Sequence, residues 1–97
     1  NPSPNPRVSM GVSLRDVASL LNDGDPDAIR DTKKRWHNSR DPKLPDSLGK
    51  CAADNKSGLY APSAILEFVK KVDVLPDKQI SVMKRQLANN LRRVRDL

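Results

Sequence analysis

Two short helical patterns separated by a three-residue break constrain the fold more than any other feature of this sequence. Apolar positions in residues 14–21 recur at the spacing of one helical face, and Ser13 precedes them with an N-cap hydroxyl. Asn22-Asp23-Gly24 ends this helix, and Asp25-Pro26 starts a second one with an N-cap acid and a proline at the first helical position. A connection this short forces the two helices to cross steeply, as in a helix-turn-helix.

The second helix has one apolar side and one basic side. Ile29 and Trp36 are its strongly apolar residues, and docking them on the first helix leaves the basic side chains outward. We assign Trp36 to the core, because a single Trp on an inner face packs more often than it stacks on a base. An outward basic face fits the major groove of DNA, where Arg and Lys contact guanine and phosphates. The alternative is an ordinary helical hairpin with a solvated basic face.

The rest of the chain divides at its turn residues. Residues 40–59 are irregular, and the polar run Asp54–Gly58 between short apolar ends indicates a β-hairpin. A third helix opens at Pro62 and carries an apolar stripe to Val72. Residues 1–12, which contain the proline-rich start of the chain, are expected to form a disordered arm or linker.

The last segment, residues 77–97, has a helical pattern to its end. Ile80, Met83, Leu87, Val94 and Leu97 fall on the a and d positions of a heptad, and Asn90 occupies the remaining d position. One alternative is that this long amphipathic helix packs back on the domain. The other is that residues 80–97 form a seam between two or more copies of the chain.

The charge of the chain favours a polyanionic partner. The 97 residues include 18 Lys and Arg against 12 Asp and Glu, which gives a formal net charge of +6. Five of the acidic side chains lie in residues 1–32, so the remaining two thirds of the chain carry most of the positive charge. Nucleic acid is the commonest partner of such a surface, and a basic surface without a partner is the alternative.

The sequence lacks the features that several classes of protein require. No apolar run is long enough to span a membrane, no signal peptide is recognisable, and Cys51 has no second cysteine to pair with. The alternating acids of Asp23–Asp27 start like a calcium loop, but its sixth and twelfth positions hold Ala28 and Lys34. We expect an intracellular protein of the cytoplasm, nucleoid or nucleus, with no metal, no cofactor and no catalytic activity.

The order of elements resembles a known family. Leu14–Leu21, a helix that ends in Lys34-Arg35-Trp36, the link Leu44–Gly49 and the segment Tyr60–Phe68 are similar to the excisionase-type winged helix-turn-helix, which is related to the mercury-resistance regulators. The resemblance spans residues 13–72. It implies a mainly α fold with a small β-hairpin, in which a winged helix-turn-helix domain over residues 13–76 is followed by a long C-terminal helix.

The resemblance also implies where double-stranded DNA would bind. The second helix would enter the major groove, the hairpin would lie on the backbone or minor groove, and the start of the first helix would meet a phosphate. The candidate DNA-binding residues are Ser13, Arg15, Arg30, Lys33, Lys34, Arg35, His37, Asn38, Lys50 and Lys56. We expect the domain to be part of a larger regulatory, recombination or replication protein. A protein-interaction module that docks an acidic partner is the main alternative, and an RNA-binding domain is a weaker one.

Overall fold

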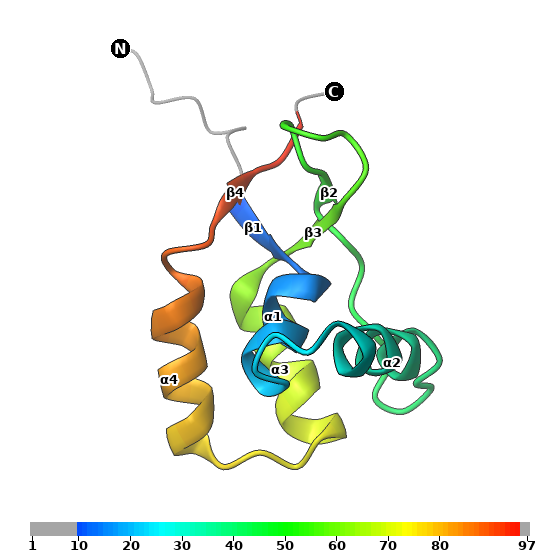
Figure 1. The fold of residues 1–97 in the computed structure, drawn as a ribbon, viewed down its shortest axis with the longest axis vertical. Helices are drawn as coiled ribbons and strands as arrows, with labels where there is room; N and C mark the ends of the chain where they lie inside the picture. Colours follow the sequence, from blue (N-terminus) through cyan, green and yellow to red (C-terminus); the bar gives the residue numbers. More distant parts are fainter. Residues whose placement is uncertain (1–9, 96–97) are drawn as a thin grey trace.

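Four helices and a small four-stranded antiparallel sheet make up the described part of the protein. The structure is a computed structural model that describes residues 10–95. In chain order the elements are β1 (Met10–Ser13), α1 (Leu14–Leu21), α2 (Pro26–His37), β2 (Gly49–Lys50), β3 (Gly58–Tyr60), α3 (Pro62–Val72), α4 (Asp77–Leu87) and β4 (Arg92–Arg93). Figure 1 shows the sheet at one end of the molecule, with α1, α3 and α4 packed below it and α2 to one side. No helix among these residues is long and apolar enough to cross a membrane.

The first two helices form where the sequence predicts them. The backbone N–H of Asp16 donates to Ser13 Oγ at 3.1 Å, which caps α1. Asp25 caps α2 in the same way and Pro26 is its first residue. The turn between them is tied to α2, because Asn22 Nδ2 donates to Thr32 Oγ1 at 3.1 Å. Three residues, Asn22, Asp23 and Gly24, lie between the end of α1 and the N-cap Asp25, as the sequence predicts.

Trp36 belongs to the core, as predicted. It is fully buried, and its ring meets Phe68 of α3 edge-on at 6.4 Å between centroids. Its indole Nε1 donates to Asp73 Oδ2 at 3.0 Å, and the neighbouring Arg35 Nη1 lies 2.6 Å from Asp73 Oδ1. These contacts fix the end of α2 against the end of α3.

The predicted hairpin is present, but it is part of a larger sheet. Strands β2 and β3 pair antiparallel, with Gly49 opposite Leu59 and Lys50 opposite Gly58. The strand order is β2-β3-β1-β4, so β1 lies inside the sheet. Residues 10–12 were expected to belong to a disordered arm, and that prediction is wrong for them because Val12 is fully buried and faces Tyr60 across the β1–β3 pair. Residues 1–9 lie outside the described residues.

The prediction of a helix up to the C-terminus is also wrong. Helix α4 ends at Leu87, and the chain returns as β4, which pairs with β1 at Met10↔Arg93. After Leu87 the chain turns: the backbone N–H groups of Asn89 and Asn90 donate to the carbonyls of Gln86 and Leu87, and asparagine is a poor helix former. The heptad seam expected along residues 80–97 therefore has no continuous helix, and Asn90 occupies no core position.

Helix α4 packs within the chain. Met83 and Leu87 are buried in the same hydrophobic core as residues of α1, α2 and α3. Val94, expected on the helix seam, instead forms a second cluster under the sheet with Cys51 and Leu59. Of the two alternatives for the helix itself, the structure has intramolecular packing.

The outer strands of the sheet meet at one end. Just beyond β2 and β4, Cys51 and Val94 form an antiparallel bridge. On either side of it the Arg95 N–H donates to the Lys50 carbonyl at 2.8 Å, and the Ala52 N–H donates to the Arg93 carbonyl at 2.9 Å. Strand β2 is thus paired with β3 on one side, and its end is joined to the end of β4 on the other.

Candidate nucleic-acid interface

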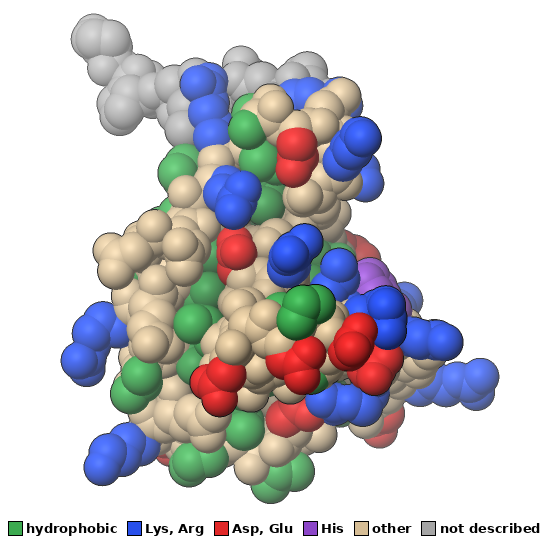
Figure 2. Space-filling view, in the orientation of Figure 1, with side chains coloured by type: hydrophobic (Ala, Val, Ile, Leu, Met, Phe, Trp, Pro, Cys, Tyr) green, Lys and Arg blue, Asp and Glu red, His purple; other side chains and the backbone are tan. Residues whose placement is uncertain are grey.

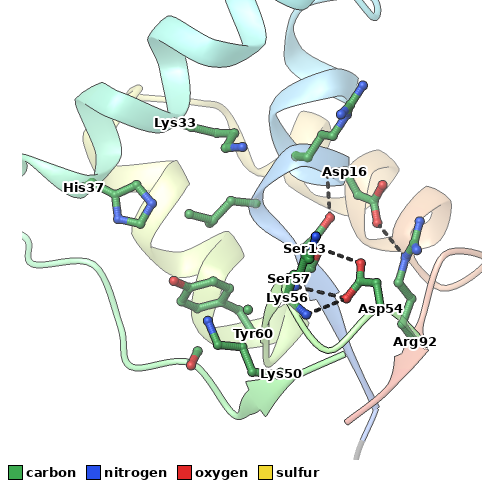
Figure 3. Close-up of a pocket in the computed structure, with 14 residues that line it drawn as sticks. Ser13, Asp16, Lys33, His37, Lys50, Asp54, Lys56, Ser57, Tyr60 and Arg92 are labelled. Carbon is green, nitrogen blue, oxygen red and sulfur yellow. Dashed lines mark hydrogen bonds and ion pairs between the residues drawn. The ribbon is translucent and has the colours of Figure 1, made fainter. Parts of the chain in front are cut away.

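An open cleft of about 710 Å³ separates α2 from the hairpin. The start of α1 forms its floor, Lys33 and His37 of α2 line one wall, and Lys50 and Lys56 of the hairpin line the other (Figure 3). The cleft exists because Ser13 ends β1 and caps α1 at the same point, which places the helix start directly beside the β1–β3 pair.

Six of the ten residues selected from the sequence line this one cleft: Ser13, Arg15, Lys33, His37, Lys50 and Lys56. Arg30 lies beside it, in a smaller hollow of about 130 Å³ that it shares with Arg15 and Lys33. The start of α1, helix α2 and the hairpin therefore contribute predicted residues to a single surface.

The helical spacing explains which side chains of α2 reach the cleft. Arg30, Lys33 and His37 follow one another at three and four residues, so they share one face of the helix. Lys34 and Asn38 are exposed but do not line the cleft. Arg35 lies on the opposite side of α2 from Lys33, where Asp73 holds its guanidinium. The structure does not bring these three residues into the site.

Positive charge dominates the cleft. Its lining includes five cationic side chains and two carboxylates, Asp16 and Asp54. The Lys and Arg residues are Arg15, Lys33, Lys50, Lys56 and Arg92. Figure 2 shows basic side chains around the hairpin and α2, and a group of carboxylates below them at the turn between α1 and α2. The charge of the surface thus changes sign from the cleft to this turn.

Both carboxylates of the cleft are engaged by neighbours. Asp16 Oδ2 lies 3.5 Å from Arg92 Nε, although it accepts no hydrogen bond within the described residues. Asp54 accepts from the backbone N–H groups of Lys56 and Ser57 and from the Ser57 hydroxyl. These hydrogen bonds, led by the one from Lys56, lower the pKa of Asp54 from 3.8 to about 2. Asp54 therefore orders the hairpin turn that carries Lys56.

Tyr60 lines the cleft but is buried, because β3 pairs with β1 and the side chain packs at the edge of the hydrophobic core. Burial raises its pKa above 10.0, and the charge of Asp46 adds to this. Trp36 and Phe68 are also buried, so the three aromatic residues of the chain offer no stacking platform on the surface.

Arg92 is the cationic residue of the cleft that sequence reasoning missed. The sequence pattern placed it on a helix, whereas β4 carries it back beside β1 and the start of α1. Ser47, Ser57 and Tyr60 were also missed, and nothing in their local sequence marks them as cleft residues. Among residues 10–95 no group of three or more His, Cys, Asp or Glu side chains is arranged to hold a metal ion.

Comparison of the chain with known protein families, with curated proteins and with solved structures found no match. The resemblance to excisionase-type winged helix-turn-helix domains therefore stays a prediction from the sequence. What the chain does has to be argued from the cleft.

Proposed function

We propose that this protein binds double-stranded DNA as a winged helix-turn-helix domain. In this proposal α2 enters the major groove and the hairpin β2–β3 lies on the backbone or minor groove. The observation that carries the proposal is the cleft, where six residues selected from the sequence meet from the start of α1, from α2 and from the hairpin, and where five lining side chains are Lys or Arg. Duplex DNA presents a line of phosphates to such a surface, and its affinity comes largely from neutralising them.

The two walls of the cleft fit different parts of a duplex. The major groove is about 12 Å wide and admits one helix, so the face of α2 with Arg30, Lys33 and His37 would meet base edges and phosphates. Lys50 and Lys56 project from the hairpin on the other side. The start of α1, with Arg15, would face a phosphate between them, since backbone N–H groups at a helix N-terminus favour anions.

Duplex fits this surface better than a single strand. Binding of unpaired bases relies on aromatic side chains on which bases stack, and each stacked base adds about 1–3 kcal/mol. Trp36 and Phe68 are buried in the core of this protein, and Tyr60, although it lines the cleft, is only 8% exposed. A surface of cations without exposed aromatics favours a partner recognised through its backbone and grooves.

Fluorescence anisotropy with a labelled duplex of mixed sequence tests the proposal. Five phosphate contacts, from Arg15, Arg30, Lys33, Lys50 and Lys56, give a slope of log K against log salt of about −4 to −5, so affinity should fall about 250- to 1000-fold between about 50 and 200 mM salt. A triple variant with Lys33, Lys50 and Lys56 replaced by Ala should reduce the slope to about −2. The matched control replaces three exposed lysines on α3 and α4, Lys71, Lys78 and Lys84, and should bind with the slope of the wild type.

The alternative function makes a different prediction in the same assay. A module that docks an acidic protein needs the same positive cleft but has no reason to fit a double helix. Absence of duplex binding at about 50 mM salt would overturn the DNA proposal. Equal losses of duplex affinity in the cleft variant and in the control variant would overturn it as well. Membership in a larger regulatory, recombination or replication protein remains part of the proposal.

A further inference from the structure

We infer that Arg92, brought to the cleft by the C-terminal strand β4, binds a phosphate of the duplex backbone, and that Asp16 positions it for this contact. The inference rests on the proposed function and adds to it a contact from a part of the chain outside the two helices and the hairpin. It concerns a phosphodiester group and not a base edge, because Arg92 lies at the end of the cleft away from α2 (Figure 3).

The guanidinium of Arg92 has hydrogen-bond donors that no acceptor among the described residues uses. Its Nε lies 3.5 Å from Asp16 Oδ2, which is the one ion pair that Arg92 forms within the described residues. The two terminal nitrogens Nη1 and Nη2 have no protein acceptor there, and the side chain is half-exposed in the cleft. Two parallel N–H donors at the end of a guanidinium match two oxygens of a phosphate.

Asp16 is placed to hold this arginine in one orientation. Its Oδ2 is buried and accepts no hydrogen bond within the described residues, and the positive charge paired with it is that of Arg92. Asp16 itself is fixed, since its backbone N–H donates to Ser13 Oγ at the start of α1. The pair therefore ties the side chain of a C-terminal strand to the floor of the cleft, and Figure 3 shows Asp16 and Arg92 facing each other there.

Arg92 also stands near the hairpin turn. The positive charge of Arg92 is one of the influences that lower the pKa of Asp54. The turn that carries Lys56 and the strand that carries Arg92 consequently lie on the same side of the cleft. Phosphate binding by Arg92 would extend the row of cations from α2 across the hairpin to β4.

The first experiment measures duplex affinity and its salt dependence for Arg92→Gln and Arg92→Lys. Arg92→Gln removes a charge and should weaken binding about tenfold at about 100 mM salt, with the slope reduced by about 0.9. Arg92→Lys keeps the charge but not the two-point contact, so affinity should fall several-fold with the slope unchanged. Arg85→Gln, on the exposed side of α4 outside the cleft, is the matched control and should change neither quantity.

The second experiment tests the role of Asp16 by whether Asp16→Asn raises or lowers the affinity for duplex DNA. If Asp16 only repelled phosphate, Asp16→Asn would raise affinity. Because it positions Arg92, Asp16→Asn should instead lower affinity about three- to tenfold, even though it makes the protein more positive. In an Arg92→Gln background the same change should raise affinity or leave it unaltered, since there is no arginine left to position.

Circular dichroism melting of each variant separates loss of contact from loss of fold. Unchanged affinity and slope in Arg92→Gln, with wild-type protein binding duplex, would overturn the contact but leave the proposed function standing. A higher affinity of Asp16→Asn in both backgrounds would overturn the positioning role. Failure of the wild type to bind duplex would overturn the proposed function itself, so the two failures are distinguishable.

Discussion

Replacing Asp73 with alanine removes the carboxylate that joins α2 to the end of α3. Its Oδ2 accepts a hydrogen bond from Trp36 Nε1 at 3.0 Å, and its Oδ1 pairs with Arg35 Nη1 at 2.6 Å. Trp36 is fully buried, so its indole N–H would keep no acceptor, which costs about 1–3 kcal/mol. The Arg35 pair is half-exposed and adds at most about 1 kcal/mol. We expect Asp73→Ala to lower the free energy of unfolding by about 2–3 kcal/mol.

Urea unfolding followed by far-ultraviolet circular dichroism measures this loss. A double-mutant cycle with Trp36→Phe identifies its source, because phenylalanine has no N–H to leave unpaired. In the Trp36→Phe background, Asp73→Ala should lower the free energy of unfolding by at least about 1 kcal/mol less than it does in the wild type. Asp77→Ala is the control: its carboxylate is exposed and pairs with Lys70, so its loss should cost less than about 1 kcal/mol.

One result would refute this reasoning. If Asp73→Ala costs the same in both backgrounds, the buried hydrogen bond to Trp36 contributes nothing measurable, and α2 is held by apolar packing alone. A change in the urea m-value of the variant would show that the native or denatured state had altered in compactness, and the cycle would then have to be repeated with Asp73→Asn.

Three further predictions address the core, a turn and the hairpin. Leu87→Asp places a carboxylate at a fully buried site and should lower the melting temperature at every protein concentration without changing the mass in sedimentation; a concentration-dependent melting temperature of the wild type would contradict this. Val74→Gly should raise the free energy of unfolding by about 1 kcal/mol in urea titration, because Val74 is exposed and has a φ of 50° that a β-branched side chain disfavours; a loss of stability would refute the strain. The pKa of Asp54 is about 2 in the folded protein against 3.8 ordinarily, so its stabilising effect is complete above about pH 4 and is lost as the pH falls towards 2. A carboxyl NMR titration should give that midpoint, and Ser57→Ala should move it upward.

Elements with local signals could be predicted from the sequence, and their boundaries agree closely with the structure. Ser13 and Asp25 cap the first two helices, and proline starts both α2 and α3. The hairpin was predicted from its polar turn, whose residue Asp54 organises it through three hydrogen bonds. In each case the deciding interaction spans only a few residues, so the sequence contains both partners side by side.

Elements held by distant partners could not be predicted. Strand β4 has two basic residues and no strand pattern, and it is a strand because β1 lies beside it. The same limit applies to the site: Arg92 reaches the cleft only through this pairing, and Arg35 leaves it because Asp73, far along the chain, binds it. The heptad pattern predicted that Leu87 lies on the apolar face of a helix. It could not show that the helix ends at Leu87 and that a strand follows.

The pairing of β1 with β4 brings the two ends of the described chain together, with Met10 opposite Arg93. Any polypeptide joined at these two points enters and leaves the fold at the same place, so the domain suits insertion into a loop of another protein. The order of its elements can then be permuted: a short linker across this pair and new ends in the exposed turn at Val74 should leave the sheet, the cleft and α2 intact.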